Sequence, residues 1–438
     1  MSEDSPSSSF CPAPWTTLAS SNDGHVQICC RALKPLRDDE GNQIPFLSHS
    51  LDSIWNSDAY QQVRQAMLIG QRLPYCTRCY QEEDRGLLSR RQRSIANNQR
   101  EMGDGGFVDW ISHLKLNKGI ADSCPSHVEV RLGSRCNLRC RICAPEFSHL
   151  IRKEMESLLD KGCKLPGFYS ENLQLIKDRD DSTWQKDYID KILSTSSTIR
   201  SLYLAGGEPF VTPSYQGLID GLIQSRDSHH IKLTINTNGT VATANWLTRL
   251  AQFESVELYI SLDSVGRALE YQRTGVNWQD IQVNLEKFLE LGERVHIKIF
   301  PTLSIYNILE IADLLSWFGE FHHTHCENVL SLQINILHTP KFLQATLLPQ
   351  EFVPEIEQQL EHLANTFSYF NQIEGKATLD KIRTVLSQCE SRVPNQNLND
   401  LWDYTQLMDK QYNQKLADYC PQTARVFSVL KNSIGCCE

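Results

Sequence analysis

The stretch RLGSRCNLRCRICAPEF, residues 131–147, sets three cysteines within eight residues, directly after the alternating apolar run VEVRL at 128–132. Free cysteines often pack as small hydrophobic side chains. Here, however, Arg135, Arg139 and Arg141 interleave the thiols, and guanidinium groups are unsuited to an apolar core. Such groups lower thiol pKa values and balance the negative charge of a metal cluster. The stretch therefore predicts a metal-binding loop after a strand.

The loop supplies three thiolates and has no fourth cysteine nearby. A structural zinc site or an ordinary cubane takes four protein ligands. Cys136, Cys140 and Cys143 can hold three irons of a [4Fe–4S] cluster and leave the fourth iron open, as catalytic metal sites keep one position open. We expect a small molecule to coordinate at that open position.

Composition narrows the class of protein. The 438-residue chain is long enough for two or three lobes, and 40% hydrophobic and 22% charged residues are typical of a soluble globular protein. Its net charge of −10 argues against a nucleic-acid binder, and RRQR at 90–93 is expected to form a solvated helix face. No long apolar run and no secretory signal are found, so we expect a cytoplasmic protein without membrane contact. Fifteen cysteines then favour metal or cluster ligation over disulfides.

Strand-like runs alternate with helical patterns after residue 128. With VEVRL as the first, the runs are IRSLYLAGG (199–207), IKLTINTNG (231–239), VELYISLDS (256–264), VHIKIFPTL (295–303) and LSLQINILH (330–338). The helical patterns include WLTRLAQF (246–253) and WQDIQVNLEKFLELG (278–292). Alternation of this kind predicts parallel strands joined by right-handed crossovers. Six such units suit an open six-stranded barrel, with the chemistry at the carboxyl ends of the strands.

These features resemble the radical S-adenosylmethionine (radical SAM) superfamily, whose mark is C-x3-C-x2-C after the first strand of a partial (β/α)6 barrel. The resemblance implies an enzyme in which the open iron of a [4Fe–4S] cluster binds S-adenosylmethionine. Reductive cleavage of that cofactor gives a 5′-deoxyadenosyl radical, which abstracts a hydrogen atom from the substrate.

The resemblance also implies roles for residues at the strand ends. GGEP at 206–209 would hold the amino group of the methionine moiety, and the TNG-like and SLD-like segments would face the rest of the cofactor. Arg273 would either approach the cofactor carboxylate or form a solvent salt bridge. The predicted cofactor-binding residues are Gly206, Gly207, Glu208, Asn238, Ser261 and Asp263.

The N-terminal segment carries a second cysteine pattern. CPAPWTTLASSNDGHVQICC (11–30) spaces Cys11 and Cys29 around Gly24, and Cys76 and Cys79 follow as C-x2-C. The pattern resembles the SPASM and twitch auxiliary-cluster domains, although here it precedes the barrel and lacks the further cysteines of a full SPASM domain. The resemblance implies one auxiliary [4Fe–4S] cluster on these four thiols, with HVQI in a small hairpin. Tetrahedral zinc suits four thiolates equally, and the role of Cys30 stays ambiguous.

The predicted organisation has four parts. It comprises a disordered tail (1–9), a SPASM/twitch-like auxiliary-cluster domain (10–100), a radical SAM partial barrel (125–340) and a helical C-terminal extension (345–438). Amphipathic helices are expected at 53–70, 351–368 and 379–393.

The resemblance favours a peptide- or protein-modifying enzyme, with L-to-D epimerisation at Cα as its reaction. Epimerisation needs a second hydrogen donor on the opposite face of the substrate. Among the thiols without an assigned role, Cys389 is the predicted catalytic residue, ahead of Cys420, Cys436 and Cys437, because it sits on a predicted helix. The expected partners are a peptide or protein substrate and an external electron donor such as flavodoxin or ferredoxin. Thioether or carbon–carbon cross-linking, and a non-catalytic iron–sulfur or zinc scaffold, are the alternatives.

Overall fold

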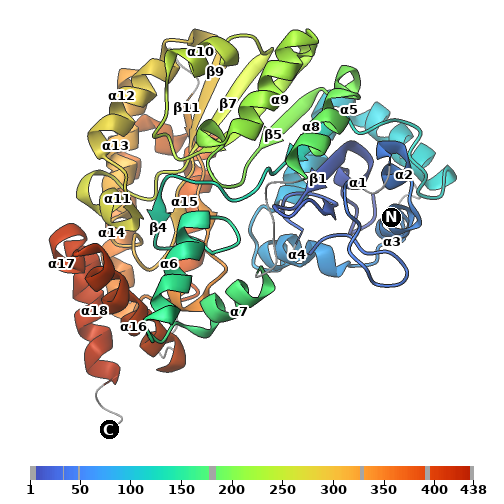
Figure 1. Cartoon of the computed structure of the whole chain (residues 1–438). Helices are drawn as coiled ribbons and strands as arrows, with labels where there is room; N and C mark the ends of the chain where they lie inside the picture. The colour runs from blue at the N-terminus through green and yellow to red at the C-terminus, as the bar shows by residue number, and fades with distance from the viewer. Residues whose placement is uncertain are drawn as a thin grey trace.

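An eight-stranded, mostly parallel sheet forms the centre of the molecule, in the strand order β11-β9-β7-β6-β5-β3-β1-β2 (Figure 1). The computed structural model describes residues 6–32, 34–47, 50–176, 184–325, 330–389 and 395–434. The strands are β1 (Thr17–Ser20), β2 (Val26–Gln27), β3 (His127–Val130), β5 (Ser201–Leu204), β6 (Lys232–Thr237), β7 (Ser255–Ile260), β9 (Val295–Ile299) and β11 (Leu330–Leu332). The six strands β3, β5, β6, β7, β9 and β11 pair in parallel. They are the six predicted from the sequence, and the α/β fold class is confirmed.

Burial alternates along these strands. In β7 the side chains of Val256, Leu258 and Ile260 are fully buried, whereas Glu257 and Tyr259 between them are only half-buried. The two rows face opposite sides of the sheet, as the period of two along a strand requires. One side of β7 is therefore fully apolar and the other carries polar groups.

Helices connect the parallel strands and cover the outer side of the sheet (Figure 1). They are α6 (His149–Asp160), α7 (Gly167–Leu175), α8 (Gln185–Leu193), α9 (Pro213–Gln224), α10 (Ala244–Leu250), α11 (Gly266–Gln272), α12 (Trp278–Leu289) and α13 (Ile311–Thr324). Of the two helices predicted here, α12 starts at the expected residue and α10 starts two residues earlier than expected. Thr243 caps α10 and Asn277 caps α12, each with a side-chain oxygen that accepts a backbone N–H.

The N-terminal lobe is continuous with the central sheet. Strands β1 and β2 form the predicted hairpin, and β1 also pairs in parallel with β3. Around this hairpin lie α1 (Ala13–Thr16), α2 (Leu51–Trp55), α3 (Asp58–Leu68), α4 (Thr77–Asp84) and α5 (Arg90–Leu116), which is interrupted at Gly103. The helix expected at 53–70 is therefore two helices, because Ser57 caps a new start. Ser9, expected in a disordered tail, is fully buried, and residues 1–5 lie outside the described part of the chain.

The expectation of a solvated helix face at 90–93 is wrong. Arg91 is buried and pairs with Glu83, and Arg90 pairs with Glu129 of β3. The basic run that begins α5 therefore faces the interior, where carboxylates from two other elements meet it. Periodicity could not reveal this, because it shows which positions share a face but not what covers that face.

The C-terminal region is helical, with α14 (Val353–Thr366), α15 (Ile373–Leu386), α16 (Asn395–Tyr412), α17 (Leu416–Tyr419) and α18 (Pro421–Ile434). The helix expected at 379–393 is displaced, since α15 begins earlier and ends at Leu386. The run expected as one strand at 330–338 is split into β11 and β12 (Asn335–Ile336), and β12 pairs with β10 (Thr302–Leu303). Cys436 and Cys437 lie outside the described residues.

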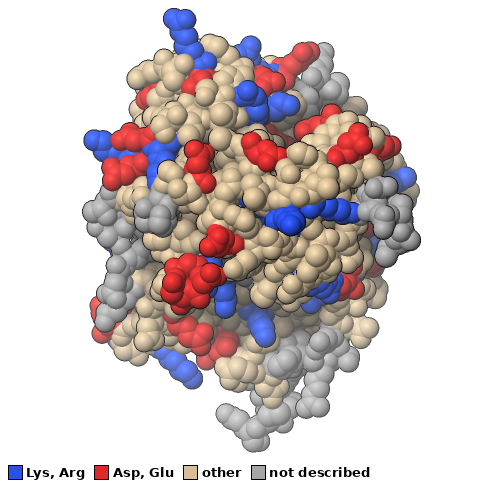
Figure 2. All heavy atoms as spheres, turned by 90° about the vertical axis from the view of Figure 1, so that its right-hand side faces the viewer, with Lys and Arg blue, Asp and Glu red and all other residues tan. Residues whose placement is uncertain are grey.

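Surface charge is mixed. On the face shown in Figure 2, acidic and basic side chains intermingle without forming a continuous field of one sign. None of the helices in the described ranges is both long and apolar enough to cross a bilayer.

The contact between α15 and the segment before it gives a test of this packing. A Cβ at Gly375 would lie 2.2 Å from the carbonyl oxygen of Tyr369, whereas a Cβ at Gly217 in α9 would meet nothing within 4 Å. Gly375→Ala is therefore expected to lower the free energy of unfolding by about 1–3 kcal/mol through overpacking. Gly217→Ala should raise it by up to about 1 kcal/mol through helix propensity. Urea unfolding followed by circular dichroism measures both, and equal stability of the two variants would contradict the packing of α15.

Candidate functional site: two clusters of thiols

The three cysteines of the 131–147 stretch converge on one side of a short two-stranded pairing. β4 (Arg139–Cys140) pairs antiparallel with β8 (Arg273–Thr274), which sets Cys140 opposite Arg273. Burial raises the pKa of Cys140 to about 12 and also raises the pKa of Cys143, and in both cases a neighbouring thiolate of the same loop adds to the rise. The three thiols thus lie close together, and metal binding must displace their protons.

One arginine of this loop, Arg141, does not serve the thiols as predicted. Arg141 turns away from them and is fully buried, with Nη2 2.9 Å from Asp409 of α16 and its guanidinium carbon 3.7 Å from the centre of the Tyr271 ring. The cation beside the thiols is Arg273, whose Nη1 donates to Cys140 Sγ at 3.8 Å. Arg273 is itself buried and pairs with Asp263 at 2.8 Å, so the alternative of a solvent salt bridge is wrong.

The GGEP turn after β5 packs directly against the cysteine loop. The backbone N–H of Glu208 donates to the carbonyl oxygen of Arg135 at 2.7 Å. A Cβ at Gly207 would lie 2.1 Å from that same oxygen, and a Cβ at Gly206 would lie 2.8 Å from Asn22 Oδ1. Both glycines also have positive φ, at 99° and 54° for Gly206 and Gly207. The close approach therefore requires glycine at these two positions.

The carboxylate of Glu208 joins the ends of β5 and β6. It is fully buried and accepts hydrogen bonds from Thr237 Oγ1 at 2.7 Å, Asn238 N at 2.6 Å and Phe210 N at 3.1 Å. Burial raises the pKa of Glu208 to about 7, although the hydrogen bonds from Asn238 and Thr237 oppose the rise. A carboxylate offers about four acceptor positions, so one stays available for a further donor.

The remaining predicted cofactor-binding residues lie at neighbouring strand ends. Asn238 donates to Asn137 of the cysteine loop at 2.8 Å. Ser261 Oγ lies 3.4 Å from Asn236 Oδ1. Asp263 is fully buried, and besides Arg273 it accepts a hydrogen bond from the backbone N–H of Thr302 at 2.8 Å. Asn238 and Asp263 thus contact the cysteine loop directly or through one side chain.

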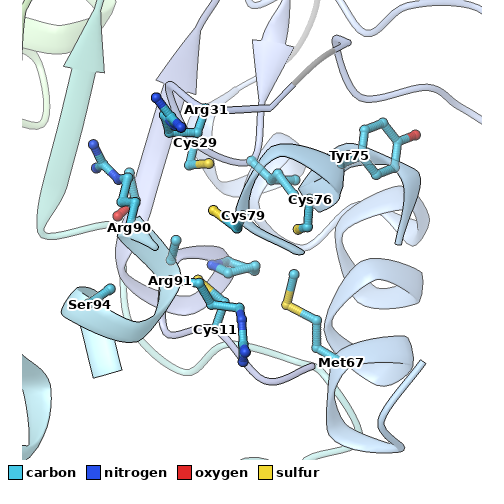
Figure 3. Close-up of a pocket in the computed structure, with 14 residues that line it drawn as sticks. Cys11, Cys29, Arg31, Met67, Tyr75, Cys76, Cys79, Arg90, Arg91 and Ser94 are labelled. Carbon is cyan, nitrogen blue, oxygen red and sulfur yellow. The ribbon is translucent and has the colours of Figure 1, made fainter. Parts of the chain in front are cut away.

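The N-terminal lobe brings together its four predicted ligands. Cys11, Cys29, Cys76 and Cys79 line one pocket, and their sulfur atoms point into it (Figure 3). Cys11 precedes α1, Cys29 follows β2, Cys76 is the N-cap of α4 and Cys79 lies in the first turn of α4. Burial raises the pKa of Cys11 to about 11 and that of Cys76 to about 12. Arg90 and Arg91 supply positive charge at the rim of the pocket. Four thiols with neighbouring guanidinium groups suit a negatively charged metal centre.

Cys30, the ambiguous neighbour, is not among the residues that line this pocket. Its thiol accepts a hydrogen bond from Arg90 Nη1 at 2.7 Å, and its backbone N–H donates to Glu129 of β3. Within the described ranges, no three His, Cys, Asp or Glu side chains are close enough to share a single metal ion. A cubane differs from such a site because its ligands are spread over four irons.

Cys389, the predicted hydrogen donor, follows the end of α15 and is buried. Its Sγ donates to the carbonyl oxygens of Val385 at 3.7 Å and Ala345 at 3.9 Å. Val385 and Ala345 both line a cavity of about 900 Å³ between α4 and the C-terminal region, but Cys389 itself does not. The thiol therefore lies behind one wall of that cavity.

Sequence reasoning missed the contacts that cross between elements. The pairing of Cys140 with Arg273 rests on a ladder of two residues on each side, which is too short to give a periodic signal. The contact of Asn137 with Asn238 joins a loop to a turn 101 residues away. The sequence did show arginines in the cysteine loop and at the start of α5, which could have signalled buried ion pairs. The partners of these arginines, however, depend on the tertiary fold.

Comparison with known proteins agrees with this geometry. Residues 130–318 match the family described as "Radical SAM superfamily", and residues 11–80 match the family "SPASM: Iron-sulfur cluster-binding domain". [4Fe–4S] clusters and S-adenosylmethionine are the cofactors of these families, as the sequence predicted. The loop with three thiols fits a [4Fe–4S] cluster that leaves one iron open for S-adenosylmethionine. The pocket with four thiols fits a second [4Fe–4S] cluster in which every iron has a protein ligand.

Several individual proteins are similar over part of the chain. GTP 3′,8-cyclases of Brucella ovis and Brucella canis are each 28% identical over 204 residues, which is 44% of this chain and 48% of theirs. The chain thus spans about half the length of the curated relatives that it matches. Among solved structures, Streptococcus suis SuiB bound to S-adenosylmethionine has 16% identity and a TM-score of 0.38, covering 72% of this chain and 64% of SuiB. Native anSMEcpe with bound AdoMet has 17% identity and a TM-score of 0.34, covering 54% and 58%.

Iron content tests the assignment of the two thiol groups. Two [4Fe–4S] clusters would give about eight irons per chain, and replacing Cys136, Cys140 and Cys143 together by Ala should leave about four. Metal analysis of anaerobically reconstituted protein measures this, with the Cys163→Ala variant as a control that keeps all eight. About four irons plus one zinc in the unmodified protein would instead favour structural zinc on Cys11, Cys29, Cys76 and Cys79.

Proposed function

The chain carries a radical SAM domain preceded by a SPASM-type iron–sulfur cluster-binding domain, and from this premise we propose that it abstracts a hydrogen atom from a residue of a peptide or protein. The observation that best supports this proposal is the contact between the three-thiol loop and the GGEP turn. In this contact the backbone N–H of Glu208 donates a hydrogen bond to the carbonyl oxygen of Arg135. A scaffold that used cysteines only for structure would have no need of a buried carboxylate beside the thiols.

In this proposal the strand-end residues hold the cofactor. When bound at the open cluster position, S-adenosylmethionine supplies the 5′-deoxyadenosyl radical. Glu208 keeps one acceptor position for the ammonium group of the methionine moiety, while Thr237 and the backbone of Asn238 fix its orientation. Arg273 holds positive charge against Cys140 and is itself held by Asp263. Gly206 and Gly207 let the turn approach the loop.

The second thiol pocket would hold an auxiliary cluster on Cys11, Cys29, Cys76 and Cys79. Because β1 pairs with β3, this pocket and the cysteine loop are attached to one sheet. An external donor such as flavodoxin or ferredoxin would supply electrons to the protein in the cytoplasm.

Within this class of enzyme, L-to-D epimerisation at Cα is the reaction that we propose, with Cys389 as hydrogen donor. Burial raises the pKa of Cys389 to about 11, so its thiol keeps its hydrogen at neutral pH. Its neighbours Val385 and Gln388 line the 900 Å³ cavity, so the thiol lies beside the space that a substrate would occupy in this proposal. Formation of a thioether or carbon–carbon cross-link is the alternative and needs no such thiol.

Isotope incorporation tests the proposal. In deuterated water an epimerase leaves one deuterium on the inverted Cα, because the donor thiol exchanges with solvent before it reacts. Cys389→Ala should still form 5′-deoxyadenosine but leave the residue unepimerised, whereas the triple Ala variant of Cys136, Cys140 and Cys143 should form none. Mass spectrometry of product and cofactor measures both. A product two hydrogens lighter without deuterium would mean cross-linking, and 5′-deoxyadenosine from the triple variant would refute the radical site.

The pKa of Glu208 gives a second test. Its folded-state value of about 7 lies above the ordinary 4.5, so the stability that the neutral carboxyl contributes is complete below about pH 4.5 and is lost as the pH rises through 7. Affinity for the ammonium group should change oppositely and rise through about pH 7, since only the ionised form attracts a cation. Glu208→Gln should bind S-adenosylmethionine about tenfold more weakly at pH 8 and lose this pH dependence.

Anaerobic calorimetry from pH 6 to 8 measures the affinity. Glu254→Gln, which changes an exposed carboxylate, is the matched control and should behave as the unmodified protein does. A Glu208→Gln variant with unchanged affinity and an unchanged pH profile would contradict the role of Glu208.

A further inference from the structure

The turn between β1 and β2 reaches from the N-terminal lobe to the edge of the sheet where the cysteine loop begins. Because β1 pairs in parallel with β3, both strands end at this edge, and the hydroxyl of Ser20 accepts the backbone N–H of Arg131 at 3.2 Å. Gly24 closes the turn, since its N–H donates to the carbonyl oxygen of Ser21 at 3.2 Å. A Cβ at Gly24 would lie 3.1 Å from the Trp184 ring, so the turn is held in place from outside as well.

Asn22, in this turn, is buried and contacts two segments of the candidate cofactor site. Its Nδ2 donates to the carbonyl oxygen of Glu146 at 3.1 Å, three residues after Cys143. A Cβ at Gly206 would lie 2.8 Å from Asn22 Oδ1, so the amide oxygen lies against the first residue of the GGEP turn. The side chain of Asn22 therefore joins the end of the cysteine loop to that turn.

The amide oxygen of Asn22 is buried, and among the described residues it has no hydrogen-bond partner. Its orientation is fixed, because exchanging the amide oxygen and nitrogen would set two acceptors, Oδ1 and the carbonyl of Glu146, against each other. A buried acceptor without a donor destabilises the folded chain. A donor that binds to this oxygen would remove that cost.

A second acceptor oxygen faces the same glycine. A Cβ at Gly206 would lie 3.2 Å from the carbonyl oxygen of Gly133. Acceptors from two elements thus meet beside the first residue of the turn in which Glu208 keeps one acceptor position. An amino group carries several N–H donors, so it suits such a set of oxygens better than a single hydroxyl does.

We propose that Asn22 binds S-adenosylmethionine and that its Oδ1 accepts a hydrogen bond from the amino group of the methionine moiety. Asn22 lies within the SPASM match at 11–80 and outside the radical SAM match at 130–318, so the N-terminal lobe would contribute directly to the cofactor site. This inference rests on the proposed function in one respect, because the proposed function places the amino group at the GGEP turn.

Two variants of Asn22 separate cofactor binding from a merely structural role. Asn22→Ala removes both amide atoms, whereas Asn22→Asp removes the Nδ2 donor and keeps an acceptor oxygen. Both variants lose the bond to Glu146, so both should lower the unfolding temperature of the cofactor-free protein by similar amounts. Only Asn22→Ala should lose affinity for S-adenosylmethionine, by about tenfold. Anaerobic calorimetry on the reconstituted holoenzyme measures the affinity, and circular dichroism during heating measures unfolding.

Asn172→Ala is the matched structural control. Asn172 Oδ1 accepts the backbone N–H of Glu146 at 3.1 Å, so this variant loosens the same segment from the side of α7. It should lower the unfolding temperature and leave the affinity unchanged, and Asn97→Ala, at an exposed position on α5, should also leave the affinity unchanged. The inference is overturned if Asn22→Ala binds as tightly as the unmodified protein, or if Asn22→Asp or Asn172→Ala loses as much affinity as Asn22→Ala.

A double substitution tests which group of the cofactor Asn22 contacts. If Asn22 and Glu208 hold the same amino group, the effects of Asn22→Ala and Glu208→Gln on the binding free energy should not add in the combined variant. Additive effects would mean that Asn22 contacts another part of S-adenosylmethionine, and would overturn the assignment to the amino group.

Cleavage of S-adenosylmethionine by the unmodified protein separates this inference from the proposed function. Affinity that depends on Asn22 in a protein that forms no 5′-deoxyadenosine with dithionite would refute the proposed function alone. Formation of 5′-deoxyadenosine together with an affinity that ignores Asn22→Ala would refute this inference alone.

Discussion

The buried guanidinium of Arg141 constrains the rest of the site. Removing a charge from water is costly unless partners surround it, and the partners of Arg141 come from distant parts of the chain. Nε donates to the carbonyl oxygen of Tyr271, and Nη2 contacts Gln414 and Asp409 near the C-terminus. The carbonyl of Arg141 accepts the hydroxyl of Tyr404 at 2.8 Å. Because Arg141 lies between Cys140 and Cys143, these bonds fix the spacing of the thiols. The C-terminal helices thereby hold the cysteine loop in place through Arg141.

Strand pairing and an ion pair join the N-terminal lobe to the central sheet. The strand β1 could have ended in a free-standing hairpin, yet it pairs in parallel with β3, the strand that leads into the cysteine loop. Glu129 of β3 then binds Arg90 of α5 and the backbone of Cys30 next to Cys29. A displacement of the N-terminal lobe would have to break strand pairing as well as this ion pair. The separation between the two thiol groups is therefore set by one sheet rather than by a linker.

The sequence was sufficient for the parts of the fold that rest on periodicity and local spacing. The six parallel strands followed from such patterns, whereas the hairpin around Gly24 and the convergence of Cys11, Cys29, Cys76 and Cys79 followed from the resemblance of the cysteine spacing to SPASM and twitch domains. The sequence was not sufficient where the position of a side chain depends on a partner that is distant in the chain. Arg141 was expected to serve the thiols and instead anchors α16, and RRQR at 90–93 was expected in solvent and instead meets Glu83 and Glu129. A charged residue in a strand-adjacent loop has several possible partners, and only the tertiary fold selects among them.

The chemistry of the remaining thiols follows from burial. A hydrogen-atom donor must keep its S–H bond at working pH, whereas a metal ligand must lose it, so the two roles need opposite surroundings. Cys389 meets the first requirement, since no guanidinium or metal-binding neighbour contacts it within the described residues and only backbone carbonyls accept from its sulfur. Cys30 lies against Arg90, whose charge favours the thiolate and opposes the effect of burial. Burial nevertheless raises the pKa of Cys30 to about 11, as it raises that of Cys389. The two thiols therefore differ in their neighbours, a guanidinium for Cys30 and backbone carbonyls for Cys389, rather than in the direction of the pKa shift.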